Sequence, residues 1–386
     1  MDLRFTEKED AFRAECRAWL ETNVPKVSLG SGDTREGFAK HIEWENKLFD
    51  AGWAAVSWPK EYGGRESSLF EWLIFEEEYY RAGAPNRVTQ NGIFLLAPTL
   101  FEFGTTEQKE RILRAMARGD VTWGQAWSEP NAGSDLASLK STARRTDGGW
   151  LLSGQKTWST RAAFCSMAYG LFRTDSNASP YKGMTYFMFP LHADGVTVRG
   201  VDRLDGDEGF AEIFLEDVFV PDADVIGDVN NGWTVAMATT SSERGLSLRS
   251  PGRFLATASR LMALLRRYRE SADPTLRDRV LDAWMDAQAY RWFTFQTVTR
   301  MSKGEPIGPD SSMNKVFWSE MDVRTHETAL DILGPAQVLD ERSIDAVDGG
   351  EWMKDFMFAL AGPIYAGTNE IQRNIIAERV LGLPRK

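Results

Sequence analysis

The spacing of apolar residues changes twice along this chain, and these changes constrain its architecture more than any other feature. Over residues 1–120, and again over 229–386, the apolar residues recur at helical spacing. Over residues 121–228 they alternate with a period of two, which is typical of half-buried strands. The sequence therefore predicts a mostly α fold with a central β domain, flanked by an N-terminal and a C-terminal helical domain.

Local signals support this division. The sequence Asp147-Gly148-Gly149 predicts a hairpin turn, and Pro274 directly after Asp273 predicts the start of a helix. We expect the last helix to run from about Ile371 to Leu381 and to end near Gly382. The expected strands of the β domain are Trp150–Ser153, Met184–Phe189, Val196–Val198 and Glu212–Leu215.

The bulk composition argues against several classes of protein. With 386 residues, of which 42% are hydrophobic, the chain can bury a large core. Its net charge of -11 argues against nucleic-acid binding, which needs a basic face, although a few local arginines can still hold a polyanion. The amino terminus lacks an apolar signal segment, and no apolar run reaches membrane-spanning length. We therefore expect a soluble, cytoplasmic protein with no membrane association.

The cysteine content is low. Cys16 and Cys165 are far apart in the sequence and show no metal-ligand spacing. We expect two buried free thiols rather than a disulfide or a metal pair, and we predict no metal site. A reducing compartment fits this content.

Two polar segments near the start of the β domain indicate a binding site. Gln125–Asp135 gathers small residues, backbone donors and hydroxyls into a turn where the chain can approach a ligand closely. Gly154–Thr160 places an aromatic face and two hydroxyls on an expected strand. Either segment alone is a weak signal, because such turns are common and a strand tryptophan more often fills a core. Together they suit a flat cofactor that forms hydrogen bonds.

With two further motifs, Leu215–Pro221 and Ile364–Arg373, these segments make the sequence resemble the acyl-CoA dehydrogenases along nearly its whole length. The resemblance implies an N-terminal helical domain, a middle β-barrel-like domain and a C-terminal four-helix bundle. It also implies FAD as cofactor and an acyl-CoA thioester as substrate, into which a Cα–Cβ double bond is introduced.

The resemblance also assigns the cofactor contacts. It places Ser128 and the backbone around it at the pyrimidine side of the flavin, and Trp158 and Thr160 beside the ring. It runs Thr368-Asn369-Glu370 past the diphosphate and ribityl groups, and the same segment can also serve as a helix cap. The full expected set is Gln125, Trp127, Ser128, Gly133, Ser134, Trp158, Ser159, Thr160, Arg300, Thr368 and Glu370, with Ser134 also contacting substrate.

The catalytic base stands at an alternative position. Many members of the family carry it before Gly-Thr in the C-terminal motif, where this chain has Ala366. In relatives resembling isovaleryl-CoA dehydrogenase, a glutamate on the helix after the β domain replaces it, and Glu243 stands at that place. The resemblance implies Glu243 as base, Arg244 as a CoA contact and the Ala366 backbone N–H as a donor to the thioester oxygen. From the residues alone, Glu243 and Arg244 also fit a solvated pair on an exposed helix.

The motifs that a neighbouring subunit normally donates to the FAD site are altered. Arg300–Gly304 lacks the expected phenylalanine, and Asp331–Ala336 has an aspartate where glutamine is expected and a proline that removes a backbone donor. We expect either a heterotetramer with a second acyl-CoA dehydrogenase-like chain or a homotetramer. By resemblance, the electron acceptor is an electron-transfer flavoprotein.

The acyl group is expected to lie near Thr89–Phe94 and Leu246–Leu248. Gly92 and Ser247 could leave room for a bulky group, whereas Phe94 and Leu95 would narrow the site, and the sequence does not decide between these alternatives. The displaced base favours a bulky or branched acyl group. Two alternatives stay open: a flavin oxidase or monooxygenase on the same scaffold, and a non-catalytic partner subunit of a heteromeric dehydrogenase.

Overall fold

The chain folds into two compact units. The computed structural model describes residues 4–244, 250–268, 273–305, 308–309 and 311–385, without the side chains of 241–244. The helical unit comprises residues 1–24, 68–84 and 244–386, and the sheet unit comprises 25–67 and 85–243. The N-terminal helices divide between these units, and the three domain ranges given above stay a prediction.

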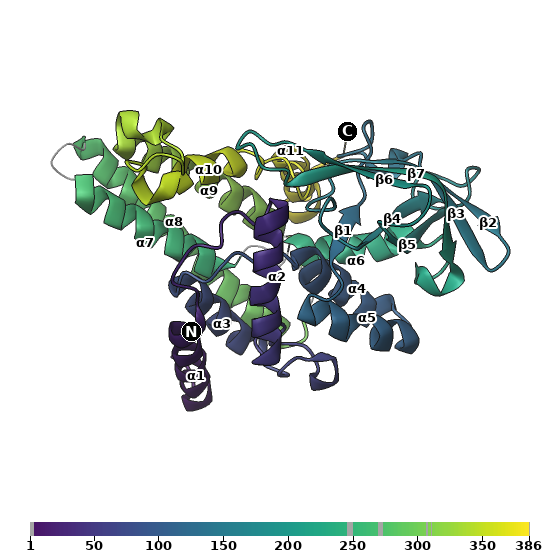
Figure 1. The fold of residues 1–386 in the computed structure, drawn as a ribbon, viewed down its shortest axis with the longest axis horizontal. Coiled ribbons are helices and arrows are strands. Elements are labelled where there is room, and N and C mark those ends of the chain that lie inside the picture. The colour runs from purple at the N-terminus through teal and green to yellow at the C-terminus, as the bar shows by residue number, and fades with distance from the viewer. Residues whose placement is uncertain (1–3, 245–249, 269–272, 306–307, 310, 386) are drawn as a thin grey trace. The chain divides into compact units, whose positions relative to one another are not determined.

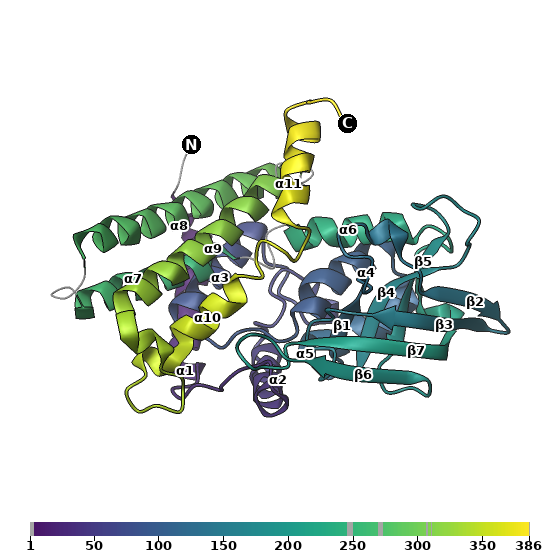
Figure 2. The same ribbon diagram turned by 90° about the horizontal axis from the view of Figure 1, so that it is seen from above.

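The helical unit is a bundle in which long helices pack against one another. Helices α7, α8 and α9 pack pairwise, α3 packs against α1 and α7, and α10 and α11 pack against α9. Figure 2 shows α7, α8 and α9 side by side. The helices of this unit are α1 (Glu7–Asn23), α3 (Leu69–Arg81), α7 (Pro251–Tyr268), α8 (Pro274–Met301), α9 (Ser311–Leu333), α10 (Glu351–Ala359) and α11 (Asn369–Ile375). Short 3-10 or π turns follow at η5 (Gly334–Val338), η6 (Val347–Gly350) and η7 (Ile376–Val380).

Local sequence signals place the helix ends. Asp273 caps α8 by accepting a hydrogen bond from the Thr275 N–H, and Pro274 occupies the first helical position, as predicted. The predicted closing helix is confirmed as α11 followed by η7, and Gly382 beyond it has a φ of 68°. The core of the unit is apolar, with Leu261, Leu264 and Trp352 almost completely buried.

The sheet unit holds the β domain. Among the described residues eight strands form one sheet in the order β6-β7-β3-β2-β4-β5-β8, with β1 added in parallel to β4. Figure 1 shows β6, β7, β3 and β2 in this order. The strands are β1 (Trp123–Ala126), β2 (Thr142–Thr146), β3 (Gly149–Lys156), β4 (Met167–Arg173), β5 (Met184–Pro190), β6 (Val196–Val201), β7 (Phe210–Pro221) and β8 (Val225–Ile226). The four predicted strands are confirmed within β3, β5, β6 and β7.

The predicted hairpin turn is also present. β2 and β3 pair antiparallel and are joined by Asp147 and Gly148, whose φ of 72° is the left-handed conformation that glycine adopts without strain. Buried side chains from several strands, including Leu152, Phe172 and Phe187, form the core. These observations confirm the predicted mostly α fold with a central β domain.

Helices of the same unit pack close to the sheet. A π-helical turn, η2, contacts β1, α4 and α5, and α2 contacts α5. The helical segments of this unit are α2 (Arg35–Asp50), η1 (Lys60–Tyr62), η2 (Asn91–Leu96), α4 (Ala97–Phe103), α5 (Thr106–Arg118), η3 (Leu136–Ser138), η4 (Asp222–Asp224) and α6 (Gly232–Arg244). No helix in the described parts of either unit is long and apolar enough to cross a membrane.

Candidate active site

The two polar segments predicted to bind the cofactor meet in the sheet unit. Gln125 lies in β1, near the end of that strand. The chain then turns tightly at Glu129–Ala132, and the two end residues of this turn exchange two backbone hydrogen bonds of 3.0 Å. Beyond this turn Gly133 and Ser134 are exposed. The Thr157 N–H donates to the Ser128 carbonyl at 2.8 Å, so the segments are joined through their backbones.

A buried ion pair joins the same segments through side chains. Lys156 Nζ lies 2.9 Å from Glu129 Oε1 and donates to the Leu171 carbonyl at 2.8 Å. The Glu129 carboxylate also accepts the backbone N–H groups of Lys140 and Ser141. Burial lowers the pKa of Lys156 to about 8, and the Glu129 charge only partly opposes that effect. Both residues lie within the two predicted segments, but the sequence did not predict their contact, because no local pattern reveals it.

Trp158, Ser159 and Thr160 do not lie on a strand, and that part of the sequence prediction was wrong. β3 ends at Lys156, and Trp158 has a φ of 58°, a left-handed conformation that interrupts the strand. The chain then pairs again for one residue, since Ser159 and Ala211 exchange two backbone hydrogen bonds of 3.0 Å. The indole of Trp158 is 61% exposed, so Trp158 does not fill the core of the β domain.

Two side-chain atoms near this point are buried without a hydrogen-bond partner among the described residues. They are the Ser159 hydroxyl and the indole N–H of Trp127. A buried polar atom normally has a partner, because leaving it unpaired costs about 1–3 kcal/mol. The two segments that meet here therefore carry one exposed aromatic ring and two unused hydrogen-bonding groups.

The segment predicted to line the acyl group lies next to β1. Residues 91–96 form the π-helical turn η2, a rare conformation often found at functional sites. The Thr89 hydroxyl is buried and has no partner among the described residues. At Gly92 a Cβ would come within 2.9 Å of the Met116 side chain and 3.1 Å of Trp123, so the space beside Gly92 is already filled. This packing argues against Gly92 as a source of room for a bulky group, a point that the sequence left open. Leu246–Leu248 lie outside the described residues.

The C-terminal motif lies in the helical unit. Ala366 and Gly367 are both left-handed, with φ of 56° and 80°. The buried Gln372 side chain donates to both of their carbonyls, at 3.2 and 3.3 Å, and so fixes the turn. Thr368 caps α11 by accepting the Ile371 N–H, so this segment is a helix cap whatever else it does. Glu370 is exposed beside it.

Sequence reasoning missed the groups that support this motif. Asn369 is buried, and its side-chain oxygen accepts a hydrogen bond from Lys315 at 2.7 Å and from Ser319 at 3.1 Å. Both donors lie on α9, and Lys315 is itself fully buried. A lysine within the buried face of a helix is the signal that would have pointed to this contact.

The altered partner motifs make contacts within the chain. Arg300 Nε lies 2.9 Å from Glu305 Oε2 at the end of α8. Asp331 Oδ2 lies 2.5 Å from Arg279 Nη1, and this arginine offsets the negative charge of the aspartate. Pro335 occupies the first turn of η5, where a missing N–H costs little.

Glu243 and Arg244 end helix α6, but their side chains lie outside the described residues. The helix is anchored one turn earlier, where the buried Thr239 hydroxyl lies 2.7 Å from that of Thr99 on α4. Position 243 therefore lies on a helix that is fixed to α4, the helix that follows η2.

The two cysteines are buried free thiols, as predicted. Burial raises the pKa of Cys165 to about 12, which keeps its thiol protonated and unreactive. Among the residues that the structure describes, no cluster of three histidine, cysteine or acidic side chains could hold a metal ion.

Three family models match successive parts of the chain. They are the N-terminal domain of acyl-CoA dehydrogenase over residues 6–120, the middle domain over 124–218 and the C-terminal domain over 230–381. The acyl-CoA dehydrogenase IpdE1 of Mycobacterium tuberculosis is 38% identical to this chain, with 98% of each chain covered. IpdE1 of Mycolicibacterium smegmatis is 36% identical, with 97% of this chain and 98% of the relative covered.

Solved structures show the same similarity. The Tcur3481-Tcur3483 steroid ACAD has a TM-score of 0.90 and 28% identity, with 100% of both chains covered. The ChsE4-ChsE5 complex from Mycobacterium tuberculosis has a TM-score of 0.83 and 29% identity, again with 100% of both chains covered. This chain belongs to the acyl-CoA dehydrogenase family, whose members are FAD-dependent oxidoreductases.

Proposed function

We propose that the chain dehydrogenates the Cα–Cβ bond of an acyl-CoA thioester with Glu243 as the base. One observation carries this choice of base: position 366 holds an alanine in a fixed left-handed turn, so it offers a backbone N–H but no carboxylate. The carboxylate must then come from another element. Glu243 is the candidate on α6, and Thr239 one turn earlier anchors this helix to α4.

The residues present fit FAD. In the sheet unit the exposed Trp158 ring offers an apolar face, and the Ser159 hydroxyl and the Trp127 N–H are buried without partners among the described residues. A flavin has an apolar ring face and polar atoms around its edge, so it can use both features. We propose that these residues hold the flavin ring, together with Gln125, Ser128, Gly133, Ser134 and Thr160. We assign Thr368 and Glu370 of the helical unit to the remainder of the cofactor, and Arg300 to a cofactor contact across a subunit interface. When bound, FAD accepts the β-hydrogen of the substrate with its electron pair.

The protein groups handle the proton and the developing charge. The Glu243 carboxylate takes the α-proton, so that a Cα–H bond breaks and a carboxyl O–H bond forms. The Ala366 N–H donates to the thioester oxygen as negative charge develops on it. Arg244, and Ser134 through its hydroxyl, bind the thioester and its CoA portion.

Replacement of Glu243 by glutamine tests the base. We expect Glu243→Gln to bind FAD and acyl-CoA as the wild type does, but to slow anaerobic flavin reduction by roughly 10²-fold or more. Glu107→Gln is the matched control, because Glu107 is an exposed carboxylate in the first turn of α5. Reduction of the Glu243→Gln flavin at the wild-type rate would disprove the assignment.

We propose a bulky acyl group, derived from a steroid side chain or ring. One of the similar structures is a steroid ACAD, and that similarity covers both chains completely. The displaced base points the same way. Since the space at Gly92 is filled, room for such a group must come from other lining residues. Comparing kcat/KM for a steroid-derived acyl-CoA with that for octanoyl-CoA tests this proposal, and a preference for octanoyl-CoA would reject it.

We also propose assembly with a second, related chain. One similar structure is the ChsE4-ChsE5 complex, and the other, the Tcur3481-Tcur3483 steroid ACAD, is also named for two proteins. The altered segments around Arg300 and Asp331 make ion pairs within this chain, which fits a chain that donates a weak half of the shared FAD site. Flavin content of the chain purified alone is the test: little flavin supports a heteromer, whereas one flavin per chain supports a homotetramer. An electron-transfer flavoprotein is the proposed electron acceptor.

A further inference from the structure

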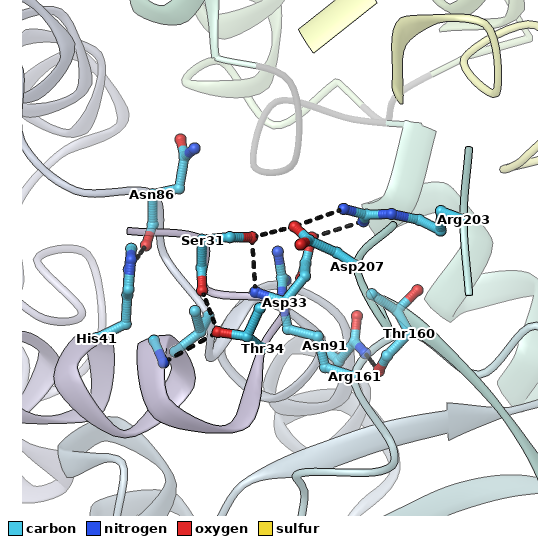
Figure 3. Close-up of polar contacts among 12 residues, drawn as sticks. Ser31, Asp33, Thr34, His41, Asn86, Asn91, Thr160, Arg161, Arg203 and Asp207 are labelled. Carbon is cyan, nitrogen blue, oxygen red and sulfur yellow. Dashed lines mark hydrogen bonds and ion pairs between the residues drawn. The ribbon is translucent and has the colours of Figure 1, made fainter. Parts of the chain in front are cut away.

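Asp33 forms a buried contact with two arginines in the sheet unit. Its Oδ1 accepts a hydrogen bond from Arg161 Nε at 2.5 Å, and its Oδ2 accepts one from Arg203 Nη1 at 2.6 Å. Figure 3 shows this contact between the loop before α2 and two loops of the β domain. Burial raises the pKa of Asp33, but the charges of Arg161 and Arg203 outweigh this effect and hold the pKa below its usual value. Asp33 is therefore charged at neutral pH.

The two arginines depend on Asp33 to different degrees. Arg203 also contacts Asp205 at 2.7 Å and Asp207 at 3.5 Å, so it keeps carboxylate partners without Asp33. For Arg161, Asp33 is the carboxylate partner found among the described residues. Loss of the Asp33 charge would thus leave Arg161 as a largely buried cation without an ion pair, which is costly.

Arg161 directly follows the segment Trp158–Thr160. The backbone is left-handed at both Trp158 and Arg161, with φ of 58° and 55°. Side-chain-bearing residues hold this conformation only where their surroundings impose it, and such sites cluster at ligand contacts. Before the segment, the Thr157 N–H is bonded to the Ser128 carbonyl. After it, the Arg161 N–H is bonded to the Gly209 carbonyl at 3.0 Å, and the guanidinium group is bonded to Asp33.

A further contact holds the end of the segment, at Thr160. Asn91 Nδ2 donates to the Thr160 carbonyl at 3.2 Å, and Asn91 begins the π-helical turn η2. Figure 3 shows Asn91 and Thr160 close to Asp33 and Arg161. The segment is thus held at several points that come from distant parts of the sequence.

We propose that Arg161, anchored by Asp33, is a positioning residue that sets the Trp158–Thr160 segment against the flavin ring. The proposal deepens the proposed function and rests on the FAD site described there. Asp33 acts through Arg161 and does not touch the reacting atoms. Its carboxylate balances the guanidinium charge and keeps the backbone after Trp158 in the left-handed conformation.

The first test uses flavin-free protein and needs no catalysis. In Asp33→Asn the amide retains the shape of the side chain but loses its charge. We expect hydrogen–deuterium exchange in peptides covering residues 157–165 to become roughly tenfold faster, because the amides of Ser159 and Arg161 lose protection. Arg35→Gln is the control: Arg35 is exposed on α2 and contacts the Ala163 carbonyl without touching Asp33. Exchange at the control rate in Asp33→Asn would overturn the proposal.

The second test uses the FAD-loaded protein. We expect Asp33→Asn to shift the visible absorption bands of the flavin and to lower kcat roughly tenfold with a smaller change in KM, because the ring contacts are displaced. If Asp33→Asn fails to fold, Arg161→Met provides the test, since it leaves Asp33 paired with Arg203. Arg161→Lys keeps the positive charge and should therefore retain most of the wild-type flavin spectrum and kcat. A normal flavin spectrum in Arg161→Met would overturn the proposal. If acyl-CoA does not reduce the wild-type flavin, the proposed function fails, while exchange and absorption still report on the positioning role.

Discussion

The Nζ atom of Lys156 lies 2.9 Å from Oε1 of Glu129, and this ion pair links the two segments that the sequence singled out as a cofactor site. Lys156 is the last residue of β3, and Glu129 begins the tight turn after β1. The Lys156 side chain is fully buried and that of Glu129 is 9% exposed. The ion pair therefore fixes the position of the Glu129–Ala132 turn relative to the sheet.

Breaking this pair should destabilise the protein strongly. We expect Lys156→Met to lower the free energy of unfolding by about 3–5 kcal/mol, since it leaves the Glu129 carboxylate buried without its counter-charge. Adding Glu129→Gln should recover part of the loss, with a coupling of about 1–3 kcal/mol. Denaturant unfolding of both single variants and the double variant measures the coupling. Lys40→Met is the control, because the Lys40–Glu36 pair is exposed and should contribute less than about 1 kcal/mol. Fully additive losses would contradict the prediction.

Acid sensitivity should depend on Glu78 of α3. Its carboxylate accepts hydrogen bonds of 2.8–3.0 Å from three guanidinium groups, those of Arg13, Arg17 and Arg81. Burial raises the pKa of Glu78, but these hydrogen bonds outweigh it and lower the pKa to about 2. Because the folded-state pKa lies below the ordinary value of about 4.3, this stabilisation is complete above that value and is lost as the pH falls toward 2.

We therefore expect Glu78→Gln to cost about 2 kcal/mol at pH 7, a figure that allows for solvent screening of the partly exposed arginines. The difference in free energy of unfolding between wild type and variant should shrink steadily between pH 4.5 and pH 2. In this range the Glu78 carboxylate of the unfolded wild type becomes protonated while that of the folded protein is still charged. Urea unfolding at several pH values measures this. A difference that is constant with pH would show that the hydrogen-bond geometry, rather than the charge, stabilises the helix contact.

The sequence could predict the elements whose signals are local. The strands of the β domain follow from a period of two, the hairpin from Asp147-Gly148, and the start of α8 from Asp273 and Pro274. The resemblance supplied the order of the motifs and the cofactor. The departure of Trp158 from the strand could not be predicted, because a left-handed conformation at a non-glycine residue is imposed by distant contacts.

The contacts that support the candidate site could not be predicted from the sequence either. Asp33 and Arg161 are 128 positions apart, and no periodicity brings them together. The filling of the space at Gly92 by Met116 and Trp123 likewise depends on tertiary packing. The choice of Glu243 as base stays a prediction from the sequence.

The turn that presents the Ala366 N–H should depend on Gln372. Gln372→Met keeps the length of the side chain but removes the donor to the carbonyls of Ala366 and Gly367. We expect a loss of about 1–3 kcal/mol in the free energy of unfolding. Under the proposed function, we also expect kcat to fall more than acyl-CoA binding. Thermal unfolding and steady-state kinetics measure the two effects, with Glu327→Gln as control, because Glu327 is an exposed carboxylate on α9. Unchanged kcat in a destabilised variant would limit Gln372 to a structural role.

Trp158 should matter for flavin binding and little for folding. Its indole is 61% exposed and its backbone is left-handed, so Trp158→Gly removes little buried surface and relieves strain. We expect the stability of the flavin-free protein to change by less than about 1 kcal/mol, because relief of the strain offsets the greater flexibility of the unfolded chain. Trp150→Ala is the comparison, since Trp150 is 6% exposed in the sheet core, and should cost about 3–5 kcal/mol.

Flavin affinity, unlike stability, should depend on the Trp158 side chain. Trp158→Gly should weaken FAD binding roughly tenfold, equivalent to about 1.4 kcal/mol, because the ring loses its aromatic contact. Trp158→Phe should retain most of the affinity. Titration of the flavin-free variants with FAD, followed by flavin fluorescence, gives the dissociation constants. Wild-type affinity in Trp158→Gly would mean that the exposed indole does not contact the flavin, and the ring face of the proposed site would then have to be assigned to another side chain.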